Sequence, residues 1–86
     1  RRRPSDAFTY AYLAKCAIAT NQMQEARTIA DRALALGPRD AATWDVLGFV
    51  FARVNEVARA RDAFQAAVKH APERPEYWLN LGAALA

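Results

Sequence analysis

Apolar and polar positions along this 86-residue chain follow the spacing of helices. In residues 22–36 the apolar positions recur at i, i+4, i+7 and i+8, which is the spacing of one buried helical face: Ala26, Ala30, Ala33 and Leu34. Residues 56–70 carry a similar stripe: Ala60, Phe64, Ala67 and Val68. The pattern predicts helices at about 6–20, 22–36, 41–54, 56–70 and 75–86.

The same apolar positions return at intervals of 34 residues. Tyr10, Trp44 and Trp78 share this lattice, and two further sets follow it: Leu13, Leu47 and Leu81, then Ala14, Gly48 and Gly82. A fixed period of this length is typical of stacked units that are each too small to bury their own apolar face. We therefore expect function to lie on a surface built by several units.

Residues that favour turns and helix ends fall between the predicted helices. Asp40 is placed to cap the third helix, and Pro75 suits the first turn of the last one. Asn21 and Asn55 are again 34 residues apart, and asparagine is the non-glycine residue best suited to the left-handed conformation that ends a helix. Each is predicted to form the sharp turn within a helix pair.

The repeated residues resemble the pattern of the tetratricopeptide repeat. The second unit matches it nearly throughout, with Trp44, Leu47, Gly48, Phe51, Ala60, Phe64, Ala67 and Pro72. The first unit departs from it at Tyr10, Ala14, Ala17 and Ala30, and the third begins with Trp78, Leu81, Gly82 and Leu85. The resemblance implies an all-α fold, a right-handed α-α superhelix of antiparallel helix pairs with about five helices.

The domain organisation follows from the same register. We expect residues 1–86 to form a single TPR-like repeat domain, with units at about 7–40 and 41–74 and an incomplete unit at 75–86. The last segment has little polar surface, whereas a terminal capping helix needs a polar outer face. We therefore expect the chain to be an excerpt of a longer protein.

Charge and composition limit the classes of partner that the chain is expected to bind. The 12 basic and 9 acidic residues give a net charge of +3, and Arg1, Arg2 and Arg3 account for that excess. A terminal cluster is not the basic stripe that binds phosphates, so we expect no nucleic acid. No apolar run is long enough for a membrane span, and we expect a cytoplasmic protein. The bias towards alanine and arginine favours a bacterial source.

The sequence carries no catalytic or metal-binding pattern. The single histidine, His70, is placed near a helix end, and Cys16 is the single cysteine. Neither belongs to a set of ligands or to a nucleophile–base pair, so each is interpreted as structural, Cys16 as a small buried side chain. Arg27 and Asp31 are interpreted as an exposed pair on one helix. We expect no enzyme activity, no metal and no cofactor.

The resemblance implies that the first helices of successive units line a concave groove. The candidate partner-binding residues are those on the face away from Trp44, Leu47 and Phe51: Phe8, Ala11, Tyr12, Lys15, Asp45, Phe49, Arg53, Glu76 and Leu79. Their aromatic side chains and scattered charges suit a peptide or a partner's helix. The alternative interpretation is that Phe8 and Phe49 only pack between neighbouring helices.

Some family members bind acidic chaperone tails through a clamp of lysine, asparagine and arginine side chains. The corresponding places here hold Ala11, Lys15, Val46, Glu76 and Asn80. None matches the clamp, and the carboxylate of Glu76 would repel such a tail. We expect no useful affinity for these tails.

A protein-interaction scaffold is the favoured function, with a peptide or partner helix in the groove. The alternative is an accessory, substrate-presenting array of a larger enzyme, such as a repeat-containing sulfotransferase or glycosyltransferase. Binding of RNA, as in the related pentatricopeptide repeats, is disfavoured by the 34-residue period and by the balanced charge. Self-association through exposed repeat ends is a further expectation.

Overall fold

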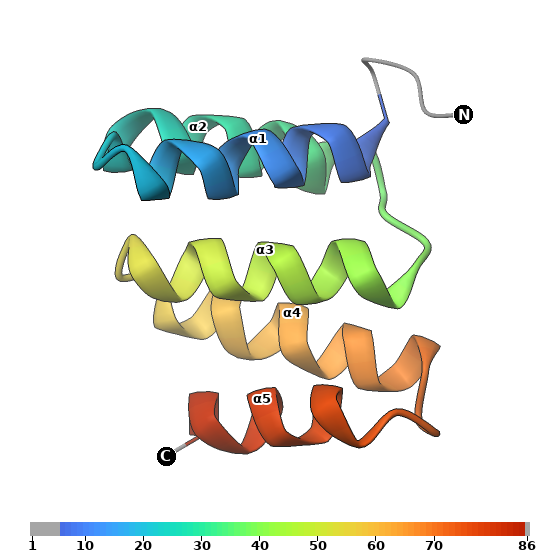
Figure 1. Cartoon of the computed structure of the whole chain (residues 1–86). Coiled ribbons are helices and arrows are strands. Elements are labelled where there is room, and N and C mark those ends of the chain that lie inside the picture. Colours follow the sequence, from blue (N-terminus) through green and yellow to red (C-terminus); the bar gives the residue numbers. More distant parts are fainter. Residues whose placement is uncertain (1–5, 86) are drawn as a thin grey trace.

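A computed structural model describes residues 6–85, and this part of the chain forms five helices and no strand. The helices are α1 (Ala7–Ala19), α2 (Met23–Ala35), α3 (Ala41–Arg53), α4 (Val57–His70) and α5 (Pro75–Leu85). Figure 1 shows two antiparallel pairs, α1 with α2 and α3 with α4, stacked in sequence order, with α5 against the second pair. The predicted all-α helical repeat is confirmed, and each predicted helix is present.

The turns inside the two pairs are built alike. Asn21 and Asn55 both adopt left-handed backbone conformations, with φ of 62° and 69°. The next residue in each case donates its backbone N–H back across the turn, from Gln22 to Ala17 and from Glu56 to Phe51, both at 2.8 Å. These bonds satisfy carbonyls that a helix end would otherwise leave unpaired. The prediction of two equivalent asparagine turns is confirmed.

The connection between the two pairs stops one helix and starts the next. Gly37 has a φ of 68° after the end of α2, a conformation that costs glycine little. Asp40 then caps α3, because its carboxylate accepts hydrogen bonds from the Thr43 backbone N–H at 3.2 Å and from the Thr43 hydroxyl at 2.7 Å. α5 begins at Pro75, as the sequence predicts.

The two helix pairs are packed with side chains of different size. Between α1 and α2 the fully buried residues are alanines: Ala11, Ala14, Ala26, Ala30 and Ala33. The second pair buries much larger side chains, among them Leu47, Val50, Phe51 and Phe64. Because apolar stabilisation scales with the area buried, the second pair contributes more of the core than the first.

Equivalent tryptophans in the second and third units form equivalent hydrogen bonds. The Trp44 indole N–H donates to the Pro38 carbonyl at 3.0 Å, and the Trp78 indole N–H donates to the Pro72 carbonyl at 2.9 Å. Each bond ties the first helix of a unit to the segment that precedes it. Trp44 is half-buried, but its equivalent Trp78 is 52% exposed.

Two side chains of α1 are open to solvent. Cys16 is exposed on α1 and is not a buried packing residue. Leu13 is also half-exposed, although its equivalent Leu47 is fully buried. The difference arises because α3 is covered by neighbours on both sides of the stack, whereas α1 packs only on α2 and α3 within the described residues.

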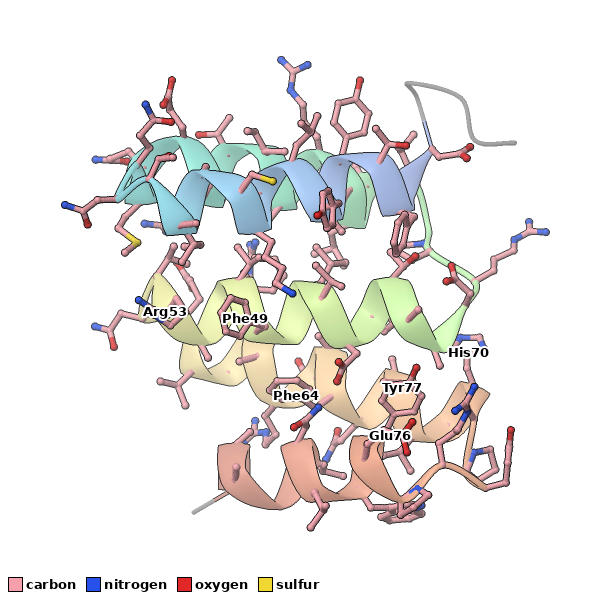
Figure 2. All side chains as sticks on the ribbon, in the orientation of Figure 1. Phe49, Arg53, Phe64, His70, Glu76 and Tyr77 are labelled. Atoms are coloured by element: carbon pink, nitrogen blue, oxygen red, sulfur yellow. The ribbon has the colours of Figure 1, made fainter. Side chains whose placement is uncertain are left out.

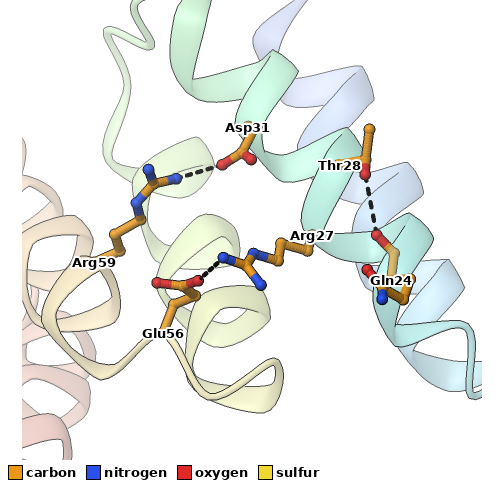
Figure 3. A network of polar contacts seen from close by, with 6 residues as sticks. All are labelled: Gln24, Arg27, Thr28, Asp31, Glu56 and Arg59. Carbon is orange, nitrogen blue, oxygen red and sulfur yellow. Dashed lines mark hydrogen bonds and ion pairs between the residues drawn. The ribbon is translucent and has the colours of Figure 1, made fainter.

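Arg27 and Asp31 pair with other partners and not with each other. Arg27 forms an ion pair with Glu56, and Asp31 forms one with Arg59 (Figure 3). Both contacts join α2 to the start of α4, so they link the two repeat units. The spacing on one helix predicted a local pair, but stacking brings opposite charges of the next unit within reach.

Candidate functional site

The first helices of the units form one side of the stack. α1 packs against α3, and α3 against α5, while α2 and α4 lie behind them in the view of Figure 1. In Figure 1 the N-termini of all three helices lie on the same side of the molecule. Side chains on their outward face therefore lie over three neighbouring helices, and this surface is called the α1–α3–α5 face below.

The first part of this face is aromatic. The rings of Phe8 and Tyr12, one turn apart on α1, are stacked with their centroids 6.3 Å apart and their planes inclined by 16°. Tyr12 is 53% exposed, and Phe8 is half-buried. Ala11 lies between them in sequence but is fully buried, so its side chain serves helix packing and is closed to a partner.

The centre of the face is the ring of Phe49 on α3, which is 37% exposed. The Lys15 ammonium, from α1, lies over the ring at 5.6 Å from its centroid. The Arg53 guanidinium, one turn further along α3, lies over it at 5.7 Å. Both distances are within the range of cation–π attraction. Figure 2 labels Phe49 and Arg53 side by side near the C-terminal end of α3.

A shallow hollow adjoins this ring. It has a volume of about 240 Å³ and is lined by Lys15, Ile18, Ala19, Phe49 and Arg53. Ile18 is buried and supplies an apolar floor, while the two cations stand at the edge. An apolar floor bordered by a few charges is the usual composition of a site that binds a side chain.

The other end of the face is acidic. Asp45, on the first turns of α3, accepts a hydrogen bond from the Asn80 side-chain amide of α5 at 2.7 Å. Burial raises the pKa of Asp45 above its ordinary value of 3.8, while the Asn80 hydrogen bond and the charge of Lys15 act in the opposite direction. The nearby charge of Glu76 adds to the rise. The hydrogen bond between Asn80 and Asp45 links α5 to α3.

Glu76 and Leu79 extend the face onto α5. Glu76 is exposed and forms an ion pair with Arg74 at 3.3 Å. Leu79 is 73% exposed, the most open of the large apolar side chains in the described part of the chain. The structure thus places Lys15 and Arg53 over the ring of Phe49. Asp45 is hydrogen-bonded to Asn80, and Leu79 belongs to neither group.

Sequence reasoning missed the two tryptophan hydrogen bonds to proline carbonyls. A signal for them was present, because a proline precedes each tryptophan by six residues in both units. It also left Asn80 without a partner, and only the tertiary structure shows that its amide reaches Asp45. A pair separated by 35 residues carries no local pattern.

Other classes of site find little support in the described residues. No group of three His, Cys, Asp or Glu side chains lies together there in a way that would hold a metal ion. His70 is exposed in the last turn of α4, as predicted from its place in the sequence. Within residues 6–85 no helix combines the length and apolar character that crossing a membrane requires.

The fold and this open multi-helix face define a helical repeat protein. The family model of the tetratricopeptide repeat matches residues 13–77, which is well over half of the chain. The chain belongs to the tetratricopeptide repeat family, whose members generally act as protein–protein interaction modules. No curated protein matches its sequence.

Proposed function

We propose that the chain is a non-catalytic interaction scaffold that binds a peptide or a partner's helix on the α1–α3–α5 face. The observation that supports this is the open ring of Phe49, which is 37% exposed beside a hollow on α3, the helix that packs against all four others. Leaving a large ring open forgoes apolar stabilisation, and a partner that covers it recovers that free energy. The family's usual role points the same way.

Phe49→Glu tests the role of this face. A displayed library of short random peptides is selected on the wild-type chain, and we expect enriched sequences that no longer bind the variant. Val57→Glu is the matched control, because Val57 is 60% exposed at the start of α4, outside the face. Circular dichroism checks that both variants remain folded. Enriched peptides that bind Phe49→Glu as well as the wild type would reject the proposal.

Self-association is a second candidate, with a second copy of the chain as the partner. On α5, Trp78 and Leu79 are exposed, and a Cβ at Gly82 would meet nothing within 4 Å. At the other end of the stack, a hollow of about 480 Å³ is lined by α1 and α2 alone, with Tyr10, Leu13 and Ile29 among its residues. Two unlike apolar ends favour head-to-tail stacking, a geometry that does not close.

Light scattering across a dilution series tests this candidate. We expect the mean mass to rise with concentration for the wild type and to stay at one chain for Leu79→Glu. A strict monomer at all concentrations would reject it. A cytoplasmic location and an accessory role in a larger enzyme are further hypotheses; microscopy of the tagged protein in cells would test the location.

A further inference from the structure

The cations around Phe49 have a feature that the groove hypothesis does not use. Lys15 and Arg53 come from two different helices, and both lie over one ring. Within residues 6–85 neither forms an ion pair with a carboxylate, whereas Arg27 and Arg59 on the other side of the stack each do. Two positive charges are therefore held next to an open apolar surface outside any ion pair, although the charge of Lys15 also acts on the nearby Asp45 carboxyl.

We propose that the Lys15–Phe49–Arg53 cluster anchors an acidic side chain, Asp or Glu, that is followed or preceded by an apolar residue in the partner peptide. The proposal rests on the proposed function of the α1–α3–α5 face. The carboxylate would lie between the ammonium and the guanidinium, whose planar fork suits a carboxylate. The apolar neighbour would pack on the Phe49 ring and the floor at Ile18.

Charge along the face selects a peptide over a polyanion. Asp45 precedes Phe49 by one turn on α3, and Glu76 opens α5, so negative charge lies towards the end opposite Arg53 (Figure 2). A nucleic acid carries a phosphate at every step and would meet these carboxylates. A peptide can instead place one acidic residue at the cluster and neutral or basic residues towards Asp45. Opposite charges at the two ends fit such a segment.

This anchor differs from the clamp that other family members use for acidic C-terminal tails. Lys15 stands where that clamp has an asparagine, and the remaining clamp places hold Ala11, Val46, Glu76 and Asn80. The proposed ligand group is a side-chain carboxylate inside the partner peptide. It is bound by one cation from each of two helices beside a phenylalanine ring.

The probe for the test is one fluorescent peptide from the enriched set, made in three forms with Glu, Gln or Lys at the acidic position. We expect the Gln form to bind the wild-type chain about two- to fivefold more weakly than the Glu form, as partly exposed charge pairs do. The double variant Lys15→Glu/Arg53→Glu should reverse the order and bind the Lys form best. Arg61→Glu/Lys69→Glu on α4 is the matched control, and it should retain the preference for Glu.

The outcomes distinguish the acidic anchor from the groove function. Enriched sequences without acidic residues, or Gln and Glu forms of equal affinity that both require Phe49, overturn the acidic anchor and leave the groove function standing. An unchanged order in the Lys15→Glu/Arg53→Glu variant, with an unchanged thermal melt, also overturns the anchor. Absence of any enrichment on the wild-type chain counts against the groove and the anchor together.

Discussion

The Phe64 ring of α4 lies directly against the backbone of Gly48 on α3, so that a Cβ at Gly48 would come within 2.5 Å of the ring's Cε1 atom. The ring is 8% exposed and Gly48 is buried, so neither has open space to move into. This contact sets how closely the two helices of the second unit approach. Gly82 is the equivalent position in α5, and it faces open space.

Gly48→Ala is therefore expected to destabilise the chain. The new methyl group must displace the Phe64 ring, and overpacking of this kind typically costs about 1–3 kcal/mol. Gly82→Ala is the matched control, because its methyl group meets nothing and alanine favours a helix interior by about 0.5–1 kcal/mol. Urea unfolding of both variants measures the difference. Opposite signs are expected, and a loss of stability in Gly82→Ala would contradict the open position.

Phe64→Ala should cost about 3–5 kcal/mol, because it removes a buried ring and leaves a cavity beside Gly48. That is a large fraction of the stability of a domain of this size, so the variant's melting temperature should fall sharply. Phe64→Leu keeps an apolar side chain and should lose less. Calorimetry or circular dichroism provides the measurement, and an unchanged melt for Phe64→Ala would refute the packing described here.

The partly buried carboxyl of Asp45 predicts a pH dependence. Its pKa is raised in the folded chain, so the folded state binds more protons than the unfolded state at a pH above 3.8. Asp45 therefore lowers the free energy of unfolding as the pH rises from about 3.8 through its raised pKa. The charges that face it are Lys15 and Glu76.

Asp45→Asn removes this titration and keeps an oxygen that accepts from Asn80. We expect the variant to gain stability relative to the wild type at neutral pH and to lose that advantage at a pH below 3.8. Chemical unfolding at several pH values compares the two chains. The same stability difference at every pH would show that burial does not act on this carboxyl.

The ion pairs between α2 and α4 are expected to contribute little. Arg27 and Arg59 are about half exposed, and such pairs typically contribute about 0.2–1 kcal/mol. A double-mutant cycle on Asp31 and Arg59 should give a small coupling energy that falls further in 1 M salt, where the screening length is about 3 Å. A coupling that persists at high salt would contradict the half-exposed state of both side chains.

Much of the fold is encoded locally. The left-handed conformations of Asn21 and Asn55, the Asp40 cap and the start of α5 at Pro75 all depend on residues within one turn of each other. Local backbone preferences act regardless of what packs later, so sequence reasoning predicted these features. The 34-residue lattice likewise predicted stacked helical units, whereas the outward face was implied by the family resemblance.

Contacts across units could not be predicted in the same way. Arg27 pairs with Glu56 and Asp45 accepts from Asn80, although neither pair shows a short-range pattern. Which of several nearby partners a long side chain reaches depends on the relative placement of helices to within a few ångströms. Exposure is decided at the same level, so Cys16 is exposed although it was interpreted as a buried side chain, and Trp78 is more exposed than its equivalent Trp44.

The sequence by itself determined the repeat, its helix boundaries and its family, because period, turn residues and apolar spacing are properties of neighbouring positions along the chain. Only the tertiary structure decided that Lys15 and Arg53 share the ring of Phe49, and that Ala11 is closed to partners. The physical reason is that α1 and α3 belong to different units, and only the stacking of these units brings their side chains together. The charge and depth of a surface made by two helices are fixed at that step.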